Sequence, residues 1–142
     1  MISVYLAGPI SDVDIHEAAA WRREAKRKLE AAGIKVYDPL RGKDLSDPGV
    51  KTNLDYVEVV ERDLHDIYCS DIVLVDLRRE VKMVGTAMEI AHAKLWGKHV
   101  FAFGQAYREN YWIRYHVNRF FGTLDEALGK IIKEASSAKT YA

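Results

Sequence analysis

Hydrophobic residues in the first third of the chain change between short continuous runs and helical spacing. Residues 2–7 form an apolar run rich in β-formers and closed by Gly8 and Pro9, which predicts a buried strand and a turn. Residues 16–32 carry apolar side chains at helical spacing and are followed by Gly33, which predicts a helix ended by glycine. Residues 34–37 predict a short second strand. Residues 38–52 predict a long polar loop of a kind that is often functional.

The rest of the chain continues this alternation of helix and strand. Leu54, Val57, Val60, Leu64 and Ile67 fall on one side of a helix with 3.6 residues per turn. The predicted elements are, in order, a helix over residues 53–68, a strand over 71–77, a helix over 85–96, a strand over 99–103, an aromatic-rich connection over 104–122 and an amphipathic helix over 123–135.

This order predicts an α/β fold. We expect one domain over residues 1–142, with a flavodoxin-like, doubly wound, five-stranded parallel sheet in the order 2-1-3-4-5 and helices on both faces. In such sheets a ligand binds beyond the carboxyl ends of the strands, where the strand order reverses. Residues 7–11, residues 76–85 and the start of the following helix are therefore expected to form the site.

The composition limits the classes of binding partner that we expect. Lys and Arg number 21 and Asp and Glu number 21, so the chain has no overall positive field for nucleic acid or an anionic membrane. No signal peptide and no apolar run of about 18 residues is present, so we expect a soluble cytoplasmic protein. The single cysteine, Cys69, excludes an internal disulfide and is interpreted as a small buried hydrophobic residue.

Glu89 is the first candidate for chemistry. The stretch from Gly85 to Glu89 opens a helix at the expected site, and a carboxylate in a first helical turn is held ionised, as a nucleophile must be. The pattern Thr86-x-x-Glu89 also fits a capping box, in which Glu89 would only bond the backbone; the same pattern recurs at Thr123-x-x-Glu126. Spacing alone leaves both interpretations open.

Other polar residues have structural and functional interpretations of their own. Asp63 is either a second carboxylate of the site or part of a salt-bridged helix flank. Tyr5 is either a core residue or a phenol that reaches a carboxylate. Asp76 sits where a receiver domain has its phospho-acceptor, but the first strand lacks the acidic pair that such a domain needs for Mg²⁺.

Neither a metal nor a cofactor is expected. The five histidines include no pair with the i, i+4 spacing and glutamate of a zinc hydrolase. No glycine-rich phosphate-binding motif is present either. The aromatic residues of the last connection are expected either to contact another subunit or to pack over the sheet; they are Tyr107, Tyr111, Trp112, Tyr115, Phe120 and Phe121.

Four segments together resemble the nucleoside 2-deoxyribosyltransferases. They are residues 5–9 (YLAGP), 62–64 (RDL), 70–75 (SDIVLV) and 85–91 (GTAMEIA), and the resemblance extends over residues 2–113. It implies that Glu89 is the nucleophile, that Tyr5 orients it and that Asp63 assists at the base. It also implies a double displacement without a cofactor, in which a deoxyribosyl group passes from a deoxynucleoside to a free nucleobase through a glycosyl-enzyme.

The resemblance also implies further contacts. The substrate would be bound by Ala7, Gly8, Pro9, Ile10, Gly85, Met88, Asn110 and Trp112. Asn110 would reach the 5′-hydroxyl in a neighbouring subunit, so that a homo-oligomer completes its sites across subunits. Met83 departs from the aspartate that many transferases have there, which leaves base recognition open, and the C-terminal tail is assigned no role.

A related group hydrolyses deoxynucleoside 5′-monophosphates with the same glutamate. Its members hold phosphate through a serine and an arginine after the first strand and a serine before the glutamate, where this chain has Pro9, Ser11 and Met83. We therefore predict a transferase first and a nucleoside or nucleotide N-glycosidase second. The third hypothesis is a non-catalytic nucleoside-binding or receiver-like module in which Glu89 is only a cap.

Overall fold

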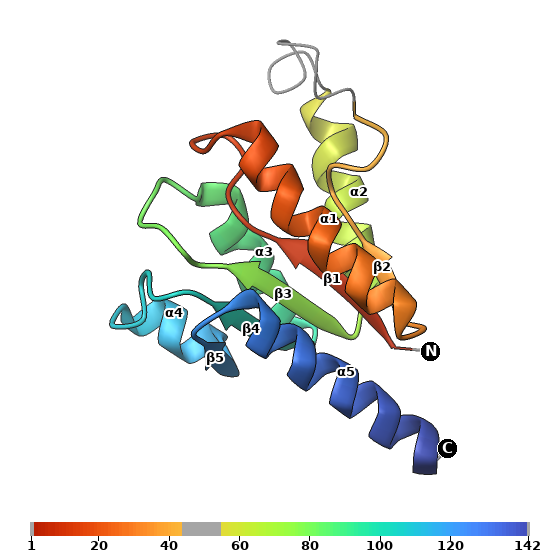
Figure 1. Cartoon of the computed structure of the whole chain (residues 1–142). Helices are drawn as coiled ribbons and strands as arrows, with labels where there is room; N and C mark the ends of the chain where they lie inside the picture. The colour runs from red at the N-terminus through yellow and green to blue at the C-terminus, as the bar shows by residue number, and fades with distance from the viewer. Residues whose placement is uncertain (1, 44–54, 142) are drawn as a thin grey trace.

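The computed structural model describes residues 2–43 and 55–141 and contains a five-stranded sheet (Figure 1). The strands are β1 (Ser3–Ala7), β2 (Lys35–Tyr37), β3 (Ile72–Asp76), β4 (His99–Phe103) and β5 (Arg119–Phe121). Their order is β2-β1-β3-β4-β5, and every neighbouring pair is parallel. The predicted flavodoxin-like order is confirmed.

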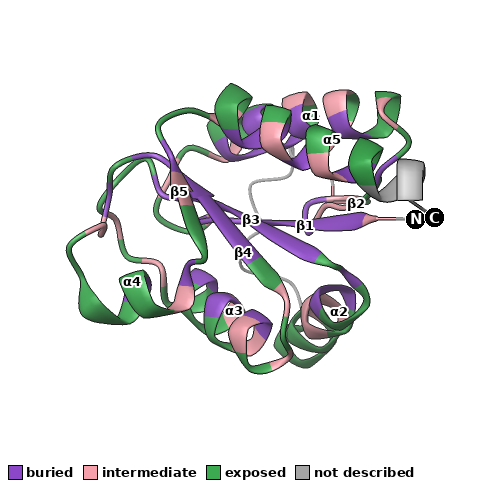
Figure 2. Cartoon of the chain, turned by 90° about the horizontal axis from the view of Figure 1, so that it is seen from below, coloured by how far each residue is buried: buried purple, intermediate pink, exposed green. Residues whose placement is uncertain are grey.

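Helices cover both faces of this sheet. They are α1 (Ile15–Ala31), α2 (Tyr56–Cys69), α3 (Val84–Leu95), α4 (Tyr111–His116) and α5 (Leu124–Tyr141). Figure 2 shows α1 and α5 on one side of the buried strands, with α2, α3 and α4 on the other. The hydrophobic residues therefore form two cores, one on each face.

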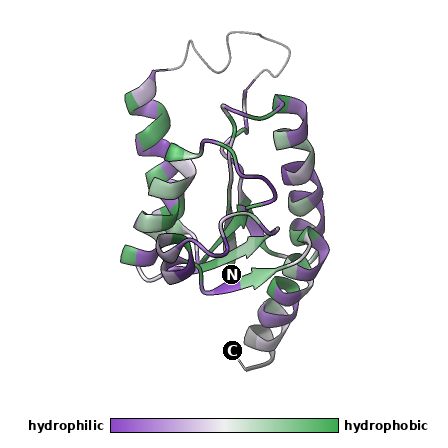
Figure 3. Cartoon of the chain, turned by 90° about the vertical axis from the view of Figure 1, so that its left-hand side faces the viewer, coloured by the Kyte–Doolittle hydropathy of each residue, from purple (hydrophilic) through white to green (hydrophobic). Residues whose placement is uncertain are grey.

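Successive residues of a strand point to opposite faces, and β1 divides its side chains in this way. Val4 and Leu6 belong to the core under α1 and α5, whereas Tyr5 and Ala7 belong to the core under α2 and α3. Both faces are buried, which explains the continuous hydrophobic runs of the strands. Figure 3 shows predominantly hydrophobic strands and helices in which hydrophobic and hydrophilic stretches alternate.

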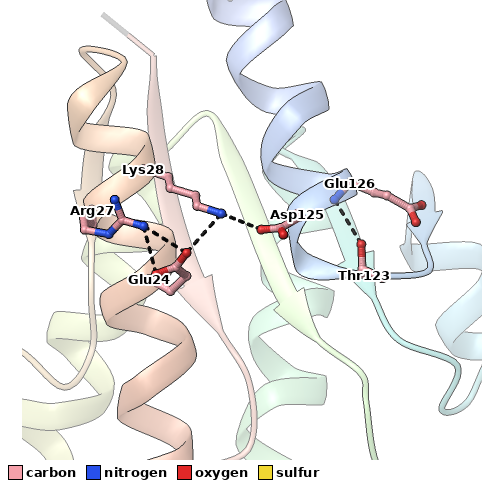
Figure 4. Close-up of polar contacts among 6 residues, drawn as sticks. All are labelled: Glu24, Arg27, Lys28, Thr123, Asp125 and Glu126. Atoms are coloured by element: carbon pink, nitrogen blue, oxygen red, sulfur yellow. Dashed lines mark hydrogen bonds and ion pairs between the residues drawn. The ribbon is translucent and has the colours of Figure 1, made fainter.

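Local signals account for the start of α1 and for its contact with α5. The carboxylate of Asp14 caps α1 by accepting from His16 N (2.8 Å) and Glu17 N (3.1 Å). Lys28 Nζ lies 2.7 Å from Asp125 Oδ1 of α5 and 3.0 Å from Glu24 Oε1 (Figure 4). Because these charges are largely solvated, they orient the two helices more than they stabilise them.

The segment predicted as a connection over residues 104–122 contains regular structure. It holds α4 and the edge strand β5, which the hydrophobic pattern did not locate because elements of six and three residues are too short to show a period. Its aromatic residues are divided: Phe121 is buried beside Phe101, whereas Tyr111, Trp112 and Tyr115 are 83%, 77% and 70% exposed.

The second helix also differs from its prediction. α2 begins after Asp55, which caps Val57 N and Glu58 N; most of the predicted loop and residues 53–54 lie outside the described residues. Val57 and Val60, predicted on the apolar face, are 45% and 52% exposed, whereas Ile67 of the same face is buried. Cys69 is exposed at the helix end, so its interpretation as a buried residue is wrong. Within the described residues, no helix is both long and apolar enough to span a membrane.

Candidate active site

A cleft of about 480 Å³ opens at the carboxyl ends of the strands, near the neighbouring strands β1 and β3, where the strand order reverses. This is the location predicted from the reversal of strand order. Its volume suits a small organic ligand. Apolar walls are contributed by Ile10 and Ile15 beside β1, by Val59, Val60 and Leu64 of α2, and by Met83 and Met88 around the start of α3.

Tyr5 and Glu89 meet at this cleft. The phenol of Tyr5, in the middle of β1, donates a hydrogen bond to Glu89 Oε2 of α3. Tyr5 points toward α3 because its position in the strand alternates with Val4 and Leu6, which face α1. The pKa of Tyr5 is raised well above its usual value, first by burial and then by the charge of Glu89, so its hydroxyl keeps its proton.

The geometry of α3 contradicts the capping interpretation of Glu89. The helix begins at Val84, after Met83 at the cap position without a side-chain bond, so Glu89 lies in the second turn. Thr86 is a buried residue inside the helix and its partner glutamate is bonded to Tyr5 instead. At Thr123-x-x-Glu126, by contrast, Glu126 N donates to Thr123 Oγ1 at 3.2 Å, as a cap requires (Figure 4).

The second-turn position also changes the electrostatics expected for Glu89. No acidic residue lies in the first turn of α3, so the helix terminus gives little help to an ionised Glu89. The pKa of Glu89 is raised from its usual 4.5 to about 7, mainly by burial and in smaller part by the charge of Asp63. The Tyr5 hydrogen bond, Arg22 and Lys43 act in the opposite direction.

Asp63 faces the same cleft from α2. Its Oδ1 is buried and makes no hydrogen bond within the described part of the chain, although Arg62 Nη2 lies 3.8 Å away. Burial is the main cause of its raised pKa, which Lys43 and Arg62 partly offset. The flank keeps a long ion pair with Arg62, but the burial of Oδ1 does not fit a solvated surface position. A buried carboxyl with a raised pKa is suited to carrying a proton to a ligand.

Most of the other sequence-predicted site residues surround this pair. Gly8, Pro9, Ile10, Gly85 and Met88 line the cleft. Ala7 is fully buried in β1, paired with Val75 of β3, and lies behind the cleft wall.

Asn110 and Trp112 lie apart from the cleft of their own chain. The Oδ1 of Asn110 caps α4 by accepting from Trp112 N (3.0 Å) and Ile113 N (3.1 Å). Trp112 is exposed and stacks on His116.

Sequence reasoning missed two cations of the cleft, Arg22 and Lys43. Arg22 lies on the apolar side of α1, three residues from Ala19 and from Ala25, and this position was the available signal. Lys43 follows β2 in the polar loop, where no pattern marks it. His92, three residues after Glu89 on the same helix side, also lines the cleft.

The alternative chemistries receive no support from the geometry. Asp76, the counterpart of a phospho-acceptor, accepts from the side chain of Arg78 at 2.9 and 3.0 Å. Among the described residues, no group of three His, Cys, Asp or Glu side chains is arranged to hold a metal ion. What the cleft does offer is a carboxyl–phenol pair and a second carboxyl between apolar walls, an arrangement suited to nucleophilic attack and proton transfer.

Solved structures of the same fold include two 2-deoxyribosyltransferases and an N-glycosidase. A search of curated protein sequences finds no significant match. Among solved structures, a 2-deoxyribosyltransferase from Bacillus psychrosaccharolyticus aligns with a TM-score of 0.69 at 22% identity, covering 89% of this chain and 90% of that one. A 2-deoxyribosyltransferase from Leishmania mexicana aligns with a TM-score of 0.69 at 17% identity, covering 94% and 98%. The CMP N-glycosidase of Clostridium botulinum aligns with a TM-score of 0.60 at 17% identity, covering 91% and 97%.

At these identities the solved structures establish a common fold. The family assignment comes from the sequence model described as nucleoside 2-deoxyribosyltransferase, which matches residues 4–133, from the middle of β1 into α5. That range contains Tyr5, Asp63 and Glu89. The chain belongs to the nucleoside 2-deoxyribosyltransferase family.

Proposed function

We propose that this protein transfers a 2-deoxyribosyl group from a deoxynucleoside to a free nucleobase, with Glu89 as the nucleophile. The observation that carries the proposal is the Tyr5–Glu89 hydrogen bond at the base of an apolar cleft with a second carboxyl, Asp63. The family and the 2-deoxyribosyltransferases of the same fold support the reaction class. The proposal treats residues 1–142 as one domain.

In the first half of the proposed reaction, an oxygen of Glu89 attacks C1′ of the sugar. A C1′–O ester bond forms while the C1′–N bond to the first base breaks. Tyr5 holds Oε2, so we assign the attack to Oε1. The departing base takes a proton on a ring nitrogen, and Asp63 is the proposed donor because burial raises its pKa.

In the second half, a ring nitrogen of the incoming base attacks C1′ and releases the Glu89 carboxylate. The incoming base loses a proton, which Asp63 recovers. Two displacements at C1′ return the original configuration, as in retaining glycosidases, with a base in place of water. No step in this scheme requires a cofactor.

The second candidate is hydrolysis, in which water attacks the glycosyl-enzyme. Two lysines, Lys43 and Lys82, line the cleft and could hold an anionic 5′-phosphate. The N-glycosidase fold relative acts on CMP, which makes a nucleotide substrate a specific alternative.

Product analysis separates the two candidates. The purified protein is incubated with deoxyinosine, with and without adenine, and then with deoxyinosine monophosphate, and products are followed by chromatography. Transfer gives deoxyadenosine when adenine is present and slow substrate loss otherwise. Equal hypoxanthine release with or without adenine, and faster from the monophosphate, would replace the transferase by a nucleotide hydrolase.

We further propose that a second copy of the chain completes the site through Asn110. The exposed aromatic residues of α4, Tyr111, Trp112 and Tyr115, support an interface there. Glu89→Gln and Asn110→Ala, each inactive alone, should recover part of the activity when mixed, because one hybrid site then holds both native residues. No recovery after subunit exchange, with oligomers confirmed by light scattering, would assign each site to one chain.

A further inference from the structure

Arg22 carries a charge that is completely buried. The residue is 0% exposed, and each of its three nitrogens donates to a backbone oxygen: Nη1 to Ala18 O (2.9 Å), Nη2 to Gly8 O (3.0 Å) and Nε to Leu6 O (3.5 Å). In the described part of the chain, no carboxylate lies within 4.0 Å to form an ion pair with it. Burying a charge without a close counter-ion is costly, so such a residue calls for a reason.

The position of Arg22 supplies that reason. It comes from α1, on the face of the sheet opposite α3, and reaches the carbonyl oxygens at the end of β1, where the strand order reverses. There it lines the same cleft as Glu89. A cation that comes from α1, on one face of the sheet, thus lies at the same cleft as a carboxyl group from α3, on the other face.

Gly8 packs closely in the turn that Arg22 contacts. A Cβ on Gly8 would lie 3.4 Å from Arg22 Nη2, 3.3 Å from Trp21 Cζ2 and only 3.0 Å from Asp76 Cβ. A larger residue would therefore crowd Asp76 and Trp21 first, and the turn after β1 also lies in van der Waals contact with the guanidinium. The turn that carries the predicted substrate contacts Pro9 and Ile10 is fixed by Arg22.

We propose that Arg22 is a positioning residue that fixes the turn after β1 and places a positive charge where it favours the carboxylate form of Glu89. The value of this charge for catalysis rests on the proposed role of Glu89 as nucleophile. The electrostatic coupling between Arg22 and Glu89 does not depend on that role, and it can be measured in a protein that is not turning over substrate.

The groups around Glu89 show why a cation is needed there. Tyr5 faces it from β1, Asp63 from α2, Lys43 from the segment after β2 and Arg22 from α1, while Lys82 and His92 line the same cleft. Burial and Asp63 favour the protonated carboxyl, whereas Tyr5, Arg22 and Lys43 favour the carboxylate. Of the two cations, only Arg22 is fully buried and fixed by backbone oxygens.

The test is a titration of Glu89 by NMR in protein labelled with ¹³C at the glutamate carboxyl carbon. The Glu89 signal is identified by its loss in Glu89→Gln. In Arg22→Gln its midpoint should rise by about half a unit to one unit, whereas Arg22→Lys should stay closer to wild type. Arg23→Gln is the matched control, because it removes the same charge from the exposed neighbouring position of α1 and should leave the midpoint unchanged.

A second measurement needs no change at Arg22. In wild-type protein the Nε–H signal of Arg22 should shift with the same midpoint as the Glu89 carboxyl, and this shift should disappear in Glu89→Gln. The proposal is overturned if a folded Arg22→Gln titrates like wild type, or if the Nε–H signal does not follow Glu89.

These readouts also separate this inference from the proposed function. Coupled titration in a protein that neither transfers nor hydrolyses would keep the electrostatic role of Arg22 and reject the reaction. If the enzyme is active, and if Arg22→Gln changes neither kcat nor the pH at which activity falls on the acid side of the pH–rate profile, the proposed reaction stands and the role of Arg22 is rejected.

Discussion

The hydroxyl of Tyr5 and the carboxylate of Glu89, 84 positions apart in the sequence, form one hydrogen-bonded unit between β1 and α3. Each side chain influences the protonation of the other: the charge of Glu89 raises the pKa of Tyr5 and so keeps the phenol protonated, whereas the bond from Tyr5 lowers the pKa of Glu89 and so favours the carboxylate. The Oε2 atom of Glu89 is thus held by a phenol that stays protonated while the carboxyl group ionises near neutral pH. This is the condition that a carboxylate nucleophile in an apolar cleft requires.

Tyr5→Phe should therefore lower kcat and move the acid limb of the pH profile upward. Removing the donor withdraws a hydrogen bond from the charged form of Glu89, so ionisation requires a higher pH. We expect a loss of about 10- to 100-fold in kcat near neutral pH, the scale of one hydrogen bond to a charged group. Tyr68→Phe, at an exposed position of α2, is the control. An unchanged acid limb in Tyr5→Phe would mean that the phenol is only a core residue.

The pKa of Glu89, about 7, predicts the shape of the wild-type profile. Activity at low substrate should rise with pH through neutrality, because attack requires the ionised carboxylate and protonation removes it. Rates measured with deoxyinosine and adenine across this range provide the check. A profile that is flat through neutrality would show that Glu89 ionises in the usual carboxyl range or does not act as the nucleophile.

Glu89→Gln should abolish turnover and stabilise the fold above neutral pH. The folded-state pKa of Glu89 is raised from 4.5 to about 7, so its contribution to stability is fully present below the lower value and is lost as pH rises through the higher one. A neutral glutamine avoids that loss. The free energy of unfolding of Glu89→Gln should therefore exceed that of the wild type by about 1–3 kcal/mol near pH 8 and by much less near pH 5. Urea unfolding at the two pH values measures the difference, and equal stability at both would contradict the raised pKa.

Sequence reasoning located the sheet and the main candidate residues for identifiable reasons. Strands buried on both faces have continuous apolar runs in the sequence. The helix α1 has apolar residues at helical spacing and a capping residue, Asp14, before its first turn. These elements were therefore predictable from local residues. The order of strands follows from the handedness of crossover connections, which places the cleft at the point of reversal. Glu89 and Asp63 could be named because motif and predicted position agreed.

What local patterns could not provide was the environment of each side chain. Thr86-x-x-Glu89 and Thr123-x-x-Glu126 are equivalent as patterns, yet only the second forms a cap, because Tyr5 lies within reach of Glu89. The buried charge of Arg22 depends on carbonyl oxygens at the end of β1, more than a dozen residues earlier. The short elements α4 and β5 are determined by packing at the sheet edge and not by periodicity.

Two glycines predict opposite effects of alanine on stability. Gly104, after β4, has a φ of 108°, and a Cβ there would lie 2.3 Å from the carbonyl oxygen of Leu77. Gly104→Ala should cost about 3 kcal/mol or more, because the strain and the backbone clash cannot both relax. Gly129→Ala in α5 meets nothing within 4 Å and should stabilise the protein by about 0.5–1 kcal/mol. Thermal unfolding of both variants tests this, and a stable Gly104→Ala would contradict the close approach to Leu77.

Asp63→Asn should slow departure of the base while making Glu89 easier to ionise. The variant cannot donate the proton that the leaving base needs, so kcat should fall by about 100-fold or more, and most for the bases that leave least readily. Loss of the Asp63 charge removes a cause of the raised pKa of Glu89, so the acid limb should move to lower pH, opposite to its shift in Tyr5→Phe.

Asp66, three residues after Asp63 in α2, is the matched control for this prediction. Its carboxylate is buried against Arg41 Nη2 at 2.7 Å, and it takes no part in lining the cleft. Asp66→Asn should lower the melting temperature, with a cost of about 1 kcal/mol because solvent screens the half-exposed Arg41. The charge of Asp66 acts on the site only through Asp63, so Asp66→Asn should move the acid limb less than Asp63→Asn does. Steady-state rates across pH with hypoxanthine and adenine as leaving bases compare the two variants. If Asp63→Asn lost no more activity than Asp66→Asn with either base, Asp63 would not be the proton donor, and a ring nitrogen would have to be protonated from another group or from solvent.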